Sequence, residues 1–323
     1  MSLELVRVET GPRELGPLAA VADTAREYIR ASKSDATRRA YRGDWSDFTA
    51  WCRANGAPAL PASPDTVVLY VTAAAASHAV STLTRRLAAI SQAHKTAGYD
   101  SPTGAAAVRA VMTGIRRAKG TAQNAKAPTM TDDIRAMVAA LPAGLLGVRD
   151  RALLLVGFAG AFRRSELVGL DQGDVETTRD GLVITLRRSK TDQEGEGRKV
   201  AIPYGSNPDT CPVRALDDWL AASGITTGPL FRYVNRHGQL GTQALSGFAV
   251  SKAVKRAVAA AGLDASKYSG HSLRAGLATS AAAAGVSERI IMKQTGHRSV
   301  NMVRRYIRDG SLFRENAAGQ VGL

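Results

Sequence analysis

Apolar residues recur at helical spacing through most of the first 118 residues of this 323-residue chain. In YRGDWSDFTAWCRANG, the side chains of Trp45, Phe48 and Trp51 fall near one face of a helix. The stretches SPDTVVLYVTAAAASH, STLTRRLAAISQAHKTAG and AAAVRAVMTGIRRAKG show the same period. Residues 1–118 are therefore predicted to form a bundle of four or five helices, with the first ~20 residues as candidates for disorder.

A second domain is predicted after a short linker. KGTAQNAKAP, residues 119–128, has no apolar periodicity and ends in proline, as linkers often do. The following domain, 129–323, is expected to begin with a helix capped by Thr131. LVITLRRSK and RKVAIPYG are rich in β-branched residues and flank a polar, glycine-containing segment, which predicts a β-hairpin with a mobile loop. The expected fold class is mainly α with a small β component.

The charge balance points to a polyanionic partner. Lys and Arg number 43 against 28 Asp and Glu, which gives a net charge of +15. The excess is spread over both predicted domains without a run of five like charges, so the charges are expected on folded elements. Nucleic acid is the favoured partner, and a generally basic soluble protein is the alternative.

The chain shows few signs of a metal, a disulfide or a membrane. Cys52 and Cys211 form no CxxC motif, and no histidine cluster has ligand spacing. The longest apolar run, ALLLVGFAGAF, is far shorter than the roughly 20 residues of a membrane span. We expect no metal, no membrane partner and a location in a reducing cytoplasm.

Four stretches of the second domain combine residues suited to phosphate chemistry: GAFRRSELVGL, the SKT at the end of the first hairpin strand, SGHSLRAG and TGHRSVNMVRRYI. Each alone has an ordinary explanation: a solvated turn, a surface lysine, a capping histidine or a half-buried core tyrosine. The candidate residues are Arg163, Glu166, Lys190, His271, Arg274, His297 and Tyr306.

In this order and spacing, the four stretches resemble the signature of the tyrosine recombinases, or phage integrase family. That signature is an arginine in a GxRxxE context, a hairpin lysine, HxxR, then GH or GW and a tyrosine nine residues on. Residues 269–310 look closest to the Cre-type subgroup, which has tryptophan at the position of His297. TAWCRANG and STLTRRL resemble the family's N-terminal domain. The resemblance implies a helical, SAM-like core-binding domain and an α+β catalytic domain that together form a C-shaped clamp on DNA.

The resemblance also implies a reaction. Arg163 and Arg274 would stabilise charge on the phosphoryl oxygens, since guanidinium groups stay protonated. Tyr306 would be the nucleophile, although a free phenol has a pKa near 10, and His271 the base that takes its proton. Lys190 would protonate the leaving 5′ oxygen, His297 would donate a hydrogen bond to the phosphate, and Glu166 would orient this group. The product would be a 3′-phosphotyrosyl link, resealed without ATP, metal or other cofactor.

Family resemblance further implies double-stranded DNA with an inverted-repeat target as partner, a homotetramer on two such sites and a Holliday-junction intermediate. The tail residues Leu312, Phe313, Val321 and Leu323 would then pack on a neighbouring protomer, or alternatively in cis. A prokaryotic host with a phage or plasmid context is expected; the target sequence and any accessory protein stay open.

Residues for DNA recognition are expected in both domains. Ser81, Thr82 and Arg85 would share one exposed helix face, with Arg86 nearby, and Arg38 and Arg39 would begin another DNA-facing helix. Gln243, expected at the start of the helix ALSGFAVSKAVKR, matches a base-reading position in Cre-like proteins. Any of these could instead be a solvated charge or a phosphate contact.

Two other functions remain as alternatives. A catalytically silent DNA-binding protein could keep the fold, although the complete residue set argues against it. A type IB topoisomerase uses similar chemistry but needs no paired sites.

Overall fold

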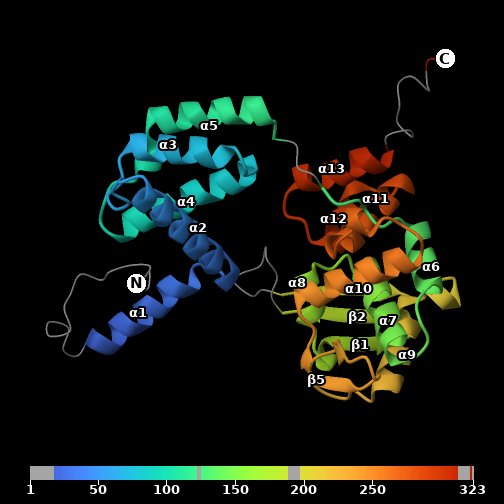
Figure 1. The fold of residues 1–323 in the computed structure, drawn as a ribbon. Helices are drawn as coiled ribbons and strands as arrows, with labels where there is room; N and C mark the ends of the chain where they lie inside the picture. Colours follow the sequence, from blue (N-terminus) through green and yellow to red (C-terminus); the bar gives the residue numbers. More distant parts are fainter. Residues whose placement is uncertain (1–17, 122–124, 188–196, 312–320, 322–323) are drawn as a thin grey trace. The chain divides into compact units, whose positions relative to one another are not determined.

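The computed structural model describes residues 18–121, 125–187, 197–311 and 321 (Figure 1). By its internal contacts the chain forms two compact units, Met1–Asn124 and Ala125–Leu323. The described part contains no helix that combines the length and the apolar character needed to cross a membrane.

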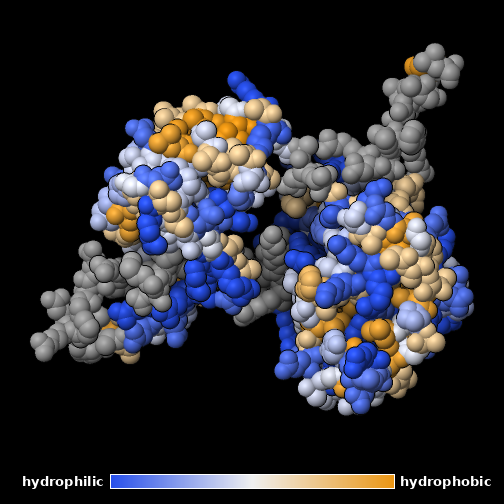
Figure 2. Space-filling view, viewed as in Figure 1, coloured by the Kyte–Doolittle hydropathy of each residue, from blue (hydrophilic) through white to orange (hydrophobic). Residues whose placement is uncertain are grey.

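The first unit is a helical bundle. Its core contains Phe48, Val67, Tyr70 and Leu83, all at most 1% exposed. Ser63 caps one helix by accepting a hydrogen bond from the Thr66 N–H, 3.1 Å away. In the view of Figure 2, hydrophilic residues gather around the junction of its first two helices. The helices are α1 (Ala19–Ala31), α2 (Asp35–Ala54), α3 (Pro64–Ala75), α4 (Val80–Thr96) and α5 (Ala106–Lys119).

The second unit is mainly helical with two small antiparallel sheets, so the predicted fold class is confirmed. Its sheets are β1-β2-β3, which contains the predicted hairpin, and β4-β5. The elements are α6 (Thr131–Ala139), α7 (Leu145–Ala159), α8 (Arg164–Val168), β1 (Val175–Thr178), β2 (Gly181–Leu186), β3 (Arg198–Pro203), α9 (Pro212–Ser223), β4 (Arg232–Val234), β5 (Leu240–Ala244), α10 (Gly247–Ala260), α11 (His271–Ala283), α12 (Glu288–Thr295) and α13 (Val300–Ser311).

One predicted cap was wrong. The N-cap of α6 is Met130 rather than Thr131, which is already helical. The Asp133 carboxylate accepts a hydrogen bond from the Met130 backbone N–H at 2.9 Å. A carboxylate in the first turn thus satisfies the backbone N–H of the N-cap residue itself.

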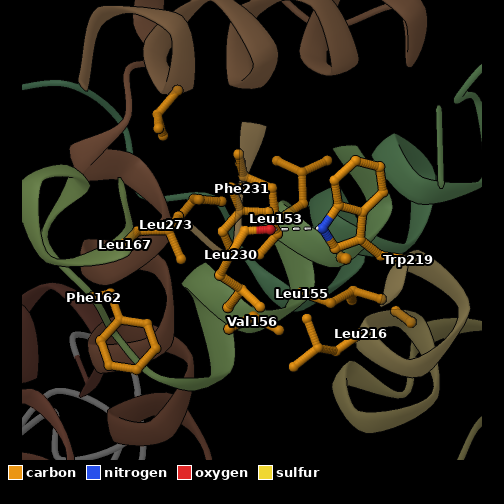
Figure 3. Packing of buried hydrophobic residues seen from close by; sticks show 14 of the residues in the cluster. Leu153, Leu155, Val156, Phe162, Leu167, Leu216, Trp219, Leu230, Phe231 and Leu273 are labelled. Carbon is orange, nitrogen blue, oxygen red and sulfur yellow. Dashed lines mark hydrogen bonds between the residues drawn. The ribbon is translucent and has the colours of Figure 1, made fainter. Parts of the chain in front are cut away.

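A large apolar core fills the second unit (Figure 3). Trp219 of α9 is fully buried, and its indole N–H donates to the Leu230 carbonyl at 2.8 Å, so its one polar atom is satisfied. A smaller cluster joins the last three helices through Ala278, Ile291 and Val303. This cluster fixes α13 against α11 and α12.

Close backbone packing holds α11 in place. A Cβ atom added to Gly276 would lie 1.9 Å from the Thr129 carbonyl oxygen. The Thr129 N–H also donates to the Ser272 carbonyl at 3.0 Å, so the backbone at residue 129 packs directly against α11. Only glycine leaves room for this contact.

We predict that Gly276→Ala destabilises the protein by about 1–3 kcal/mol, because the new methyl group must push the Thr129 backbone off α11. Urea unfolding followed by circular dichroism measures the change. The matched control is Gly114→Ala, an exposed α5 position with no atom near the added methyl group. That variant should gain about 0.5–1 kcal/mol; equal effects at both positions would contradict the packing argument.

Candidate active site

Arg274 is the buried centre of the site. It lies in the first turn of α11, three residues after His271, and is 1% exposed. One guanidinium nitrogen, Nη1, donates to the Ala161 carbonyl at 2.7 Å, and Nη2 donates to His297 Nε2 at 3.0 Å. Burial and the nearby charge of Arg163 lower the pKa of Arg274 to about 10, so it stays protonated at neutral pH.

His297 occupies the turn between α12 and α13. Gly296 precedes it with φ of 65°, the left-handed conformation that ends α12. Burial, followed by the charges of Arg274 and Arg163, lowers the pKa of His297 to about 3. The imidazole is therefore neutral in the free protein.

Tyr306 lies near one face of this group. It is on α13, which the fully buried Val303 anchors in the small cluster, and its ring centroid is 5.8 Å from that of His297. Its hydroxyl oxygen is 3.0 Å from His271 Nε2. A candidate nucleophile thus has a candidate base within hydrogen-bonding distance.

The turn after α7 positions Arg163. The Glu166 carboxylate, 5% exposed as a residue, accepts from Arg163 Nη1 at 2.6 Å and from the Arg163 backbone N–H at 2.8 Å. Arg164 points elsewhere, with its side chain against Gly247 and Gly270. The structure therefore pairs Arg163, and not Arg164, with Glu166.

Ala161 carries backbone strain at this turn. Its φ is 48°, a value that non-glycine residues rarely adopt. In the expected GxRxxE pattern this position is glycine, and here it is alanine. Its carbonyl is the acceptor for Arg274, so the strained conformation coincides with a contact to the site.

The structure brings six of the seven candidate residues into one group. Lys190 lies outside the described residues. The six are Arg163, Glu166, His271, Arg274, His297 and Tyr306.

Arg198, on β3, adds a third guanidinium that the sequence patterns did not single out. Its Nη1 donates to the Gln294 carbonyl at 3.2 Å, and its Nη2 is buried without a hydrogen-bond partner among the described residues. A Cβ on Gly296 would lie 2.8 Å from Arg198 Nε, so the guanidinium packs against the glycine before His297. The pKa of Arg198 is lowered, mainly by burial and also by the charge of Arg163. The charge of Glu166 acts in the opposite direction and raises it. Arg198 is the first residue of β3, and a basic residue at the start of a strand is too common to indicate a site residue from sequence alone.

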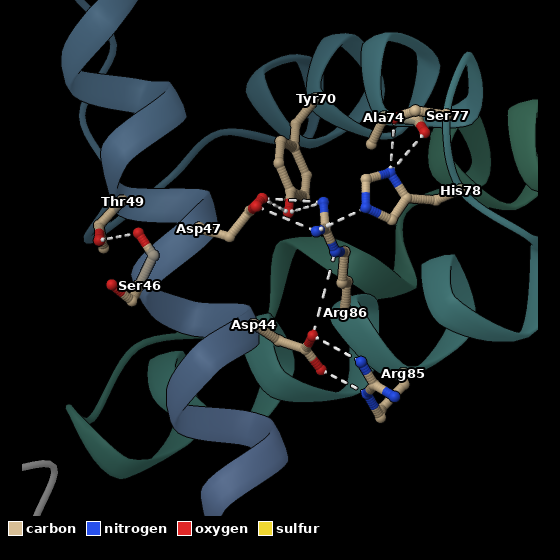
Figure 4. A network of polar contacts seen from close by, with 10 residues as sticks. All are labelled: Asp44, Ser46, Asp47, Thr49, Tyr70, Ala74, Ser77, His78, Arg85 and Arg86. Atoms are coloured by element: carbon tan, nitrogen blue, oxygen red, sulfur yellow. Dashed lines mark hydrogen bonds and ion pairs between the residues drawn. The ribbon is translucent and has the colours of Figure 1, made fainter.

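The predicted DNA-binding residues Arg85 and Arg86 have different environments (Figure 4). Arg85 forms two hydrogen bonds to Asp44, at 2.7 and 3.0 Å, yet its side chain is 48% exposed. Arg86 is 9% exposed and donates to Asp47, Tyr70 and His78. Arg86 therefore ties α4 to α2 and α3, while Arg85 keeps a surface position.

The other predicted DNA-binding residues lie on helices α2 and α4 and on one strand. Ser81 and Arg39 are exposed, whereas Thr82 and Arg38 are half-buried. Gln243 is exposed but lies in β5, so its expected place at the start of a helix was wrong; α10 begins at Gly247. Within the described ranges, no three His, Cys, Asp or Glu side chains gather as a metal site.

Comparisons with known proteins identify the family of this chain. Residues 129–311 match the model of the "Phage integrase family". The chain is 43% identical over 301 residues to an "Integrase/recombinase xerD homolog" of Selenomonas ruminantium, covering 92% of this chain and 88% of the relative. The chain belongs to the phage integrase family, the tyrosine recombinases.

One further relative and two solved structures are also similar to this chain. "Recombinase cre" of Escherichia phage P1 is 28% identical over 91% of each chain. The structure of a lambda integrase (75–356) dimer bound to a COC′ core site matches with a TM-score of 0.60 at 19% identity, covering 92% of this chain and 96% of that one. The Tn1549 transposon integrase in complex with transposon right-end DNA matches with 0.62 at 14% identity, covering 88% and 92%. The two structural matches show the shared fold.

We predict that Arg198→Met slows DNA cleavage by this tyrosine recombinase at least about tenfold, because it removes a buried positive charge beside the site. The unfolding free energy should stay equal or rise, since the variant also removes a buried donor that has no partner among the described residues. Cleavage assays and urea unfolding measure the two effects. Arg135→Met, at an exposed arginine of α6, is the control; unchanged cleavage by Arg198→Met would limit Arg198 to packing.

Proposed function

We propose that this protein is a site-specific DNA recombinase that cleaves and rejoins DNA through a 3′-phosphotyrosyl intermediate and a Holliday junction. The observation that carries the proposal is the 3.0 Å contact between the Tyr306 hydroxyl and His271 Nε2, beside the buried Arg274. Membership of the tyrosine recombinases makes this chemistry the expected use of that contact.

The proposed cleavage step is a transesterification. The Tyr306 oxygen attacks the phosphorus, the new P–O(Tyr) bond forms and the bond from phosphorus to the 5′ oxygen breaks. His271 takes the phenolic proton, and Lys190 protonates the leaving 5′ oxygen. Attack by a 5′ hydroxyl from the partner duplex reverses these events and releases Tyr306, so the step needs neither ATP nor metal.

Stabilisation of the transition state is assigned to the arginines. Arg163 and Arg274 can donate to the phosphoryl oxygens as planar forks, while Glu166 keeps Arg163 in place. Two of the Arg274 N–H groups are already used by Ala161 and His297, which fixes the direction of the others. Orientation before the substrate arrives lowers the cost of reaching the transition state.

Strand exchange requires two DNA duplexes, so we propose four protomers around two inverted-repeat sites. In this proposal 1–118 is the core-binding domain, 119–128 the linker and 129–323 the catalytic domain. The bound DNA named for the lambda and Tn1549 integrase structures supports a DNA role for this fold. Of the tail residues expected to pack on a neighbour, Leu312, Phe313 and Leu323 lie outside the described residues, and Val321 is exposed.

We predict that Tyr306→Phe abolishes covalent DNA adducts while leaving noncovalent DNA affinity unchanged, because it removes only the attacking oxygen. Wild-type protein and the variant are mixed with fragmented DNA of the host replicon and denatured in SDS. Protein-linked fragments are then recovered and sequenced.

The wild-type fragments distinguish the candidate functions. Adducts that end at one inverted-repeat sequence support the recombinase. Adducts without sequence preference favour a type IB topoisomerase, and wild-type protein without adducts favours a silent DNA binder. Adducts formed by Tyr306→Phe at the wild-type level would overturn the assignment of the nucleophile.

We predict different effects on DNA binding for substitutions of the neighbouring residues Arg85 and Arg86. Arg85→Ala should weaken DNA binding and reduce the slope of log affinity against log salt by about one, because one phosphate contact is lost. Arg86→Ala should leave the salt slope unchanged and cost about 2 kcal/mol or more of unfolding free energy, because it breaks a buried network. Arg85→Ala should also lower the unfolding free energy, because it removes the partner of the buried Asp44 carboxylate. Salt titrations and urea unfolding test the pair; a salt-slope change confined to Arg86→Ala would contradict the assignment.

A further inference from the structure

Thr295 lies directly behind His297 and has no role in the proposed reaction. The side chain is fully buried at the end of α12. Its hydroxyl oxygen is 2.7 Å from His297 Nδ1 and 2.8 Å from the Ile291 carbonyl oxygen. Through His297, this hydroxyl is connected to Arg274, because Arg274 Nη2 lies 3.0 Å from His297 Nε2.

Arg274 and the Ile291 carbonyl stand at the two ends of this chain of contacts. Their chemistry determines which atom carries the proton in each hydrogen bond. A guanidinium group only donates, so His297 Nε2 must accept from Arg274. The neutral imidazole then carries its proton on Nδ1, which donates to the Thr295 oxygen. A carbonyl only accepts, so the Thr295 hydroxyl donates to Ile291.

The alternative tautomer is disfavoured by the same geometry. With the proton on Nε2, an imidazole N–H would face an Arg274 N–H at 3.0 Å, and both are donors. An imidazolium would add a positive charge beside Arg274 at the same separation. Both alternatives place like partial charges together in a site with little solvent.

We propose that Thr295 is a positioning residue that holds His297 in the Nδ1–H tautomer, so that Nε2 orients Arg274 before DNA binds. This inference rests on the proposed recombinase function of the same site. It gives His297 a task in the free protein that differs from donating to the phosphate. To donate from Nε2 in the complex, His297 must change tautomer or gain a proton. The Thr295 hydroxyl can serve the first route by rotating to donate to Nδ1.

The variant pair Thr295→Val and Thr295→Ser separates the hydroxyl from the packing. Valine has nearly the same shape and lacks the hydroxyl, which leaves either Nδ1–H or Nε2–H of His297 as a buried donor without a suitable acceptor. Serine keeps the hydroxyl. The matched control is Thr279→Val on α11, where the buried hydroxyl makes no hydrogen bond among the described residues.

The first readout is the protonation of the His297 ring in the free protein, measured by NMR on protein with ¹⁵N-labelled histidine. His297→Gln assigns the signals among the five histidines. We expect Nδ1 protonated and Nε2 unprotonated in wild type, Thr295→Ser and Thr279→Val, and a different ring state in Thr295→Val. Wild-type protein with Nε2 protonated, or a Thr295→Val ring identical to wild type, would overturn the proposal.

The second readout is the rate of covalent adduct formation at the recovered DNA site. Thr295→Val should slow it about tenfold or more without changing noncovalent DNA affinity, and Thr295→Ser should restore most of the rate. Equal rates for Thr295→Val and Thr279→Val would also overturn the proposal. If wild-type protein forms no adduct, the recombinase function fails, while the NMR result still decides the tautomer.

Discussion

Burial of the Arg274 guanidinium is the constraint on which the catalytic unit depends. A charged group at 1% exposure is tolerated only if its N–H groups find acceptors. One acceptor is the Ala161 carbonyl, which faces Arg274 from a residue with φ of 48°. The other is His297 Nε2, which is available only while the imidazole is neutral. The orientation of Arg274 therefore depends both on the strained turn at Ala161 and on a neutral His297.

The same burial leaves the site with excess positive charge. Besides burial, the charges of Arg163 and Arg198 lower the pKa of Arg274, and the charge of Arg163 lowers that of Arg198. Glu166 is a buried carboxylate that opposes both shifts. Such a cluster is unfavourable by itself and becomes favourable when an anion enters. Hydrogen bonds to Glu166, Ala161 and His297 already orient the guanidinium groups of Arg163 and Arg274 before an anion binds. Preorganised sites stabilise charge that develops during a reaction in this way. A scissile phosphate carries the negative charge that would compensate this cluster.

The sequence predicted the parts of this site that stand in ordered motifs. Arg163, Glu166, His271, Arg274, His297 and Tyr306 follow one another at family spacing, and the structure brings them together. Arg198 lies in none of the four stretches. Thr295 begins the stretch TGHRSVNMVRRYI but is not part of its signature, and its role comes from its contact with His297. The second hairpin was missed for a related reason: β5 has no buried position, so it lacks the alternation of apolar residues that predicts a strand. Gln243 was consequently assigned to the following helix.

Adjacent residues of one type show why pattern alone could not finish the assignment. Arg163 and Arg164 are neighbours, yet only the first reaches Glu166, because α8 turns the second toward Gly247. Arg85 and Arg86 are also neighbours, and the helix places one at the surface and the other among Asp47, Tyr70 and His78. Arg85 and Arg86 are consecutive residues of α4, so their side chains point in directions about 100° apart, and one meets the core while the other meets solvent. The composition shows an excess of positive charge, but the fold determines which arginines are buried in ion-pair networks and which keep an exposed position.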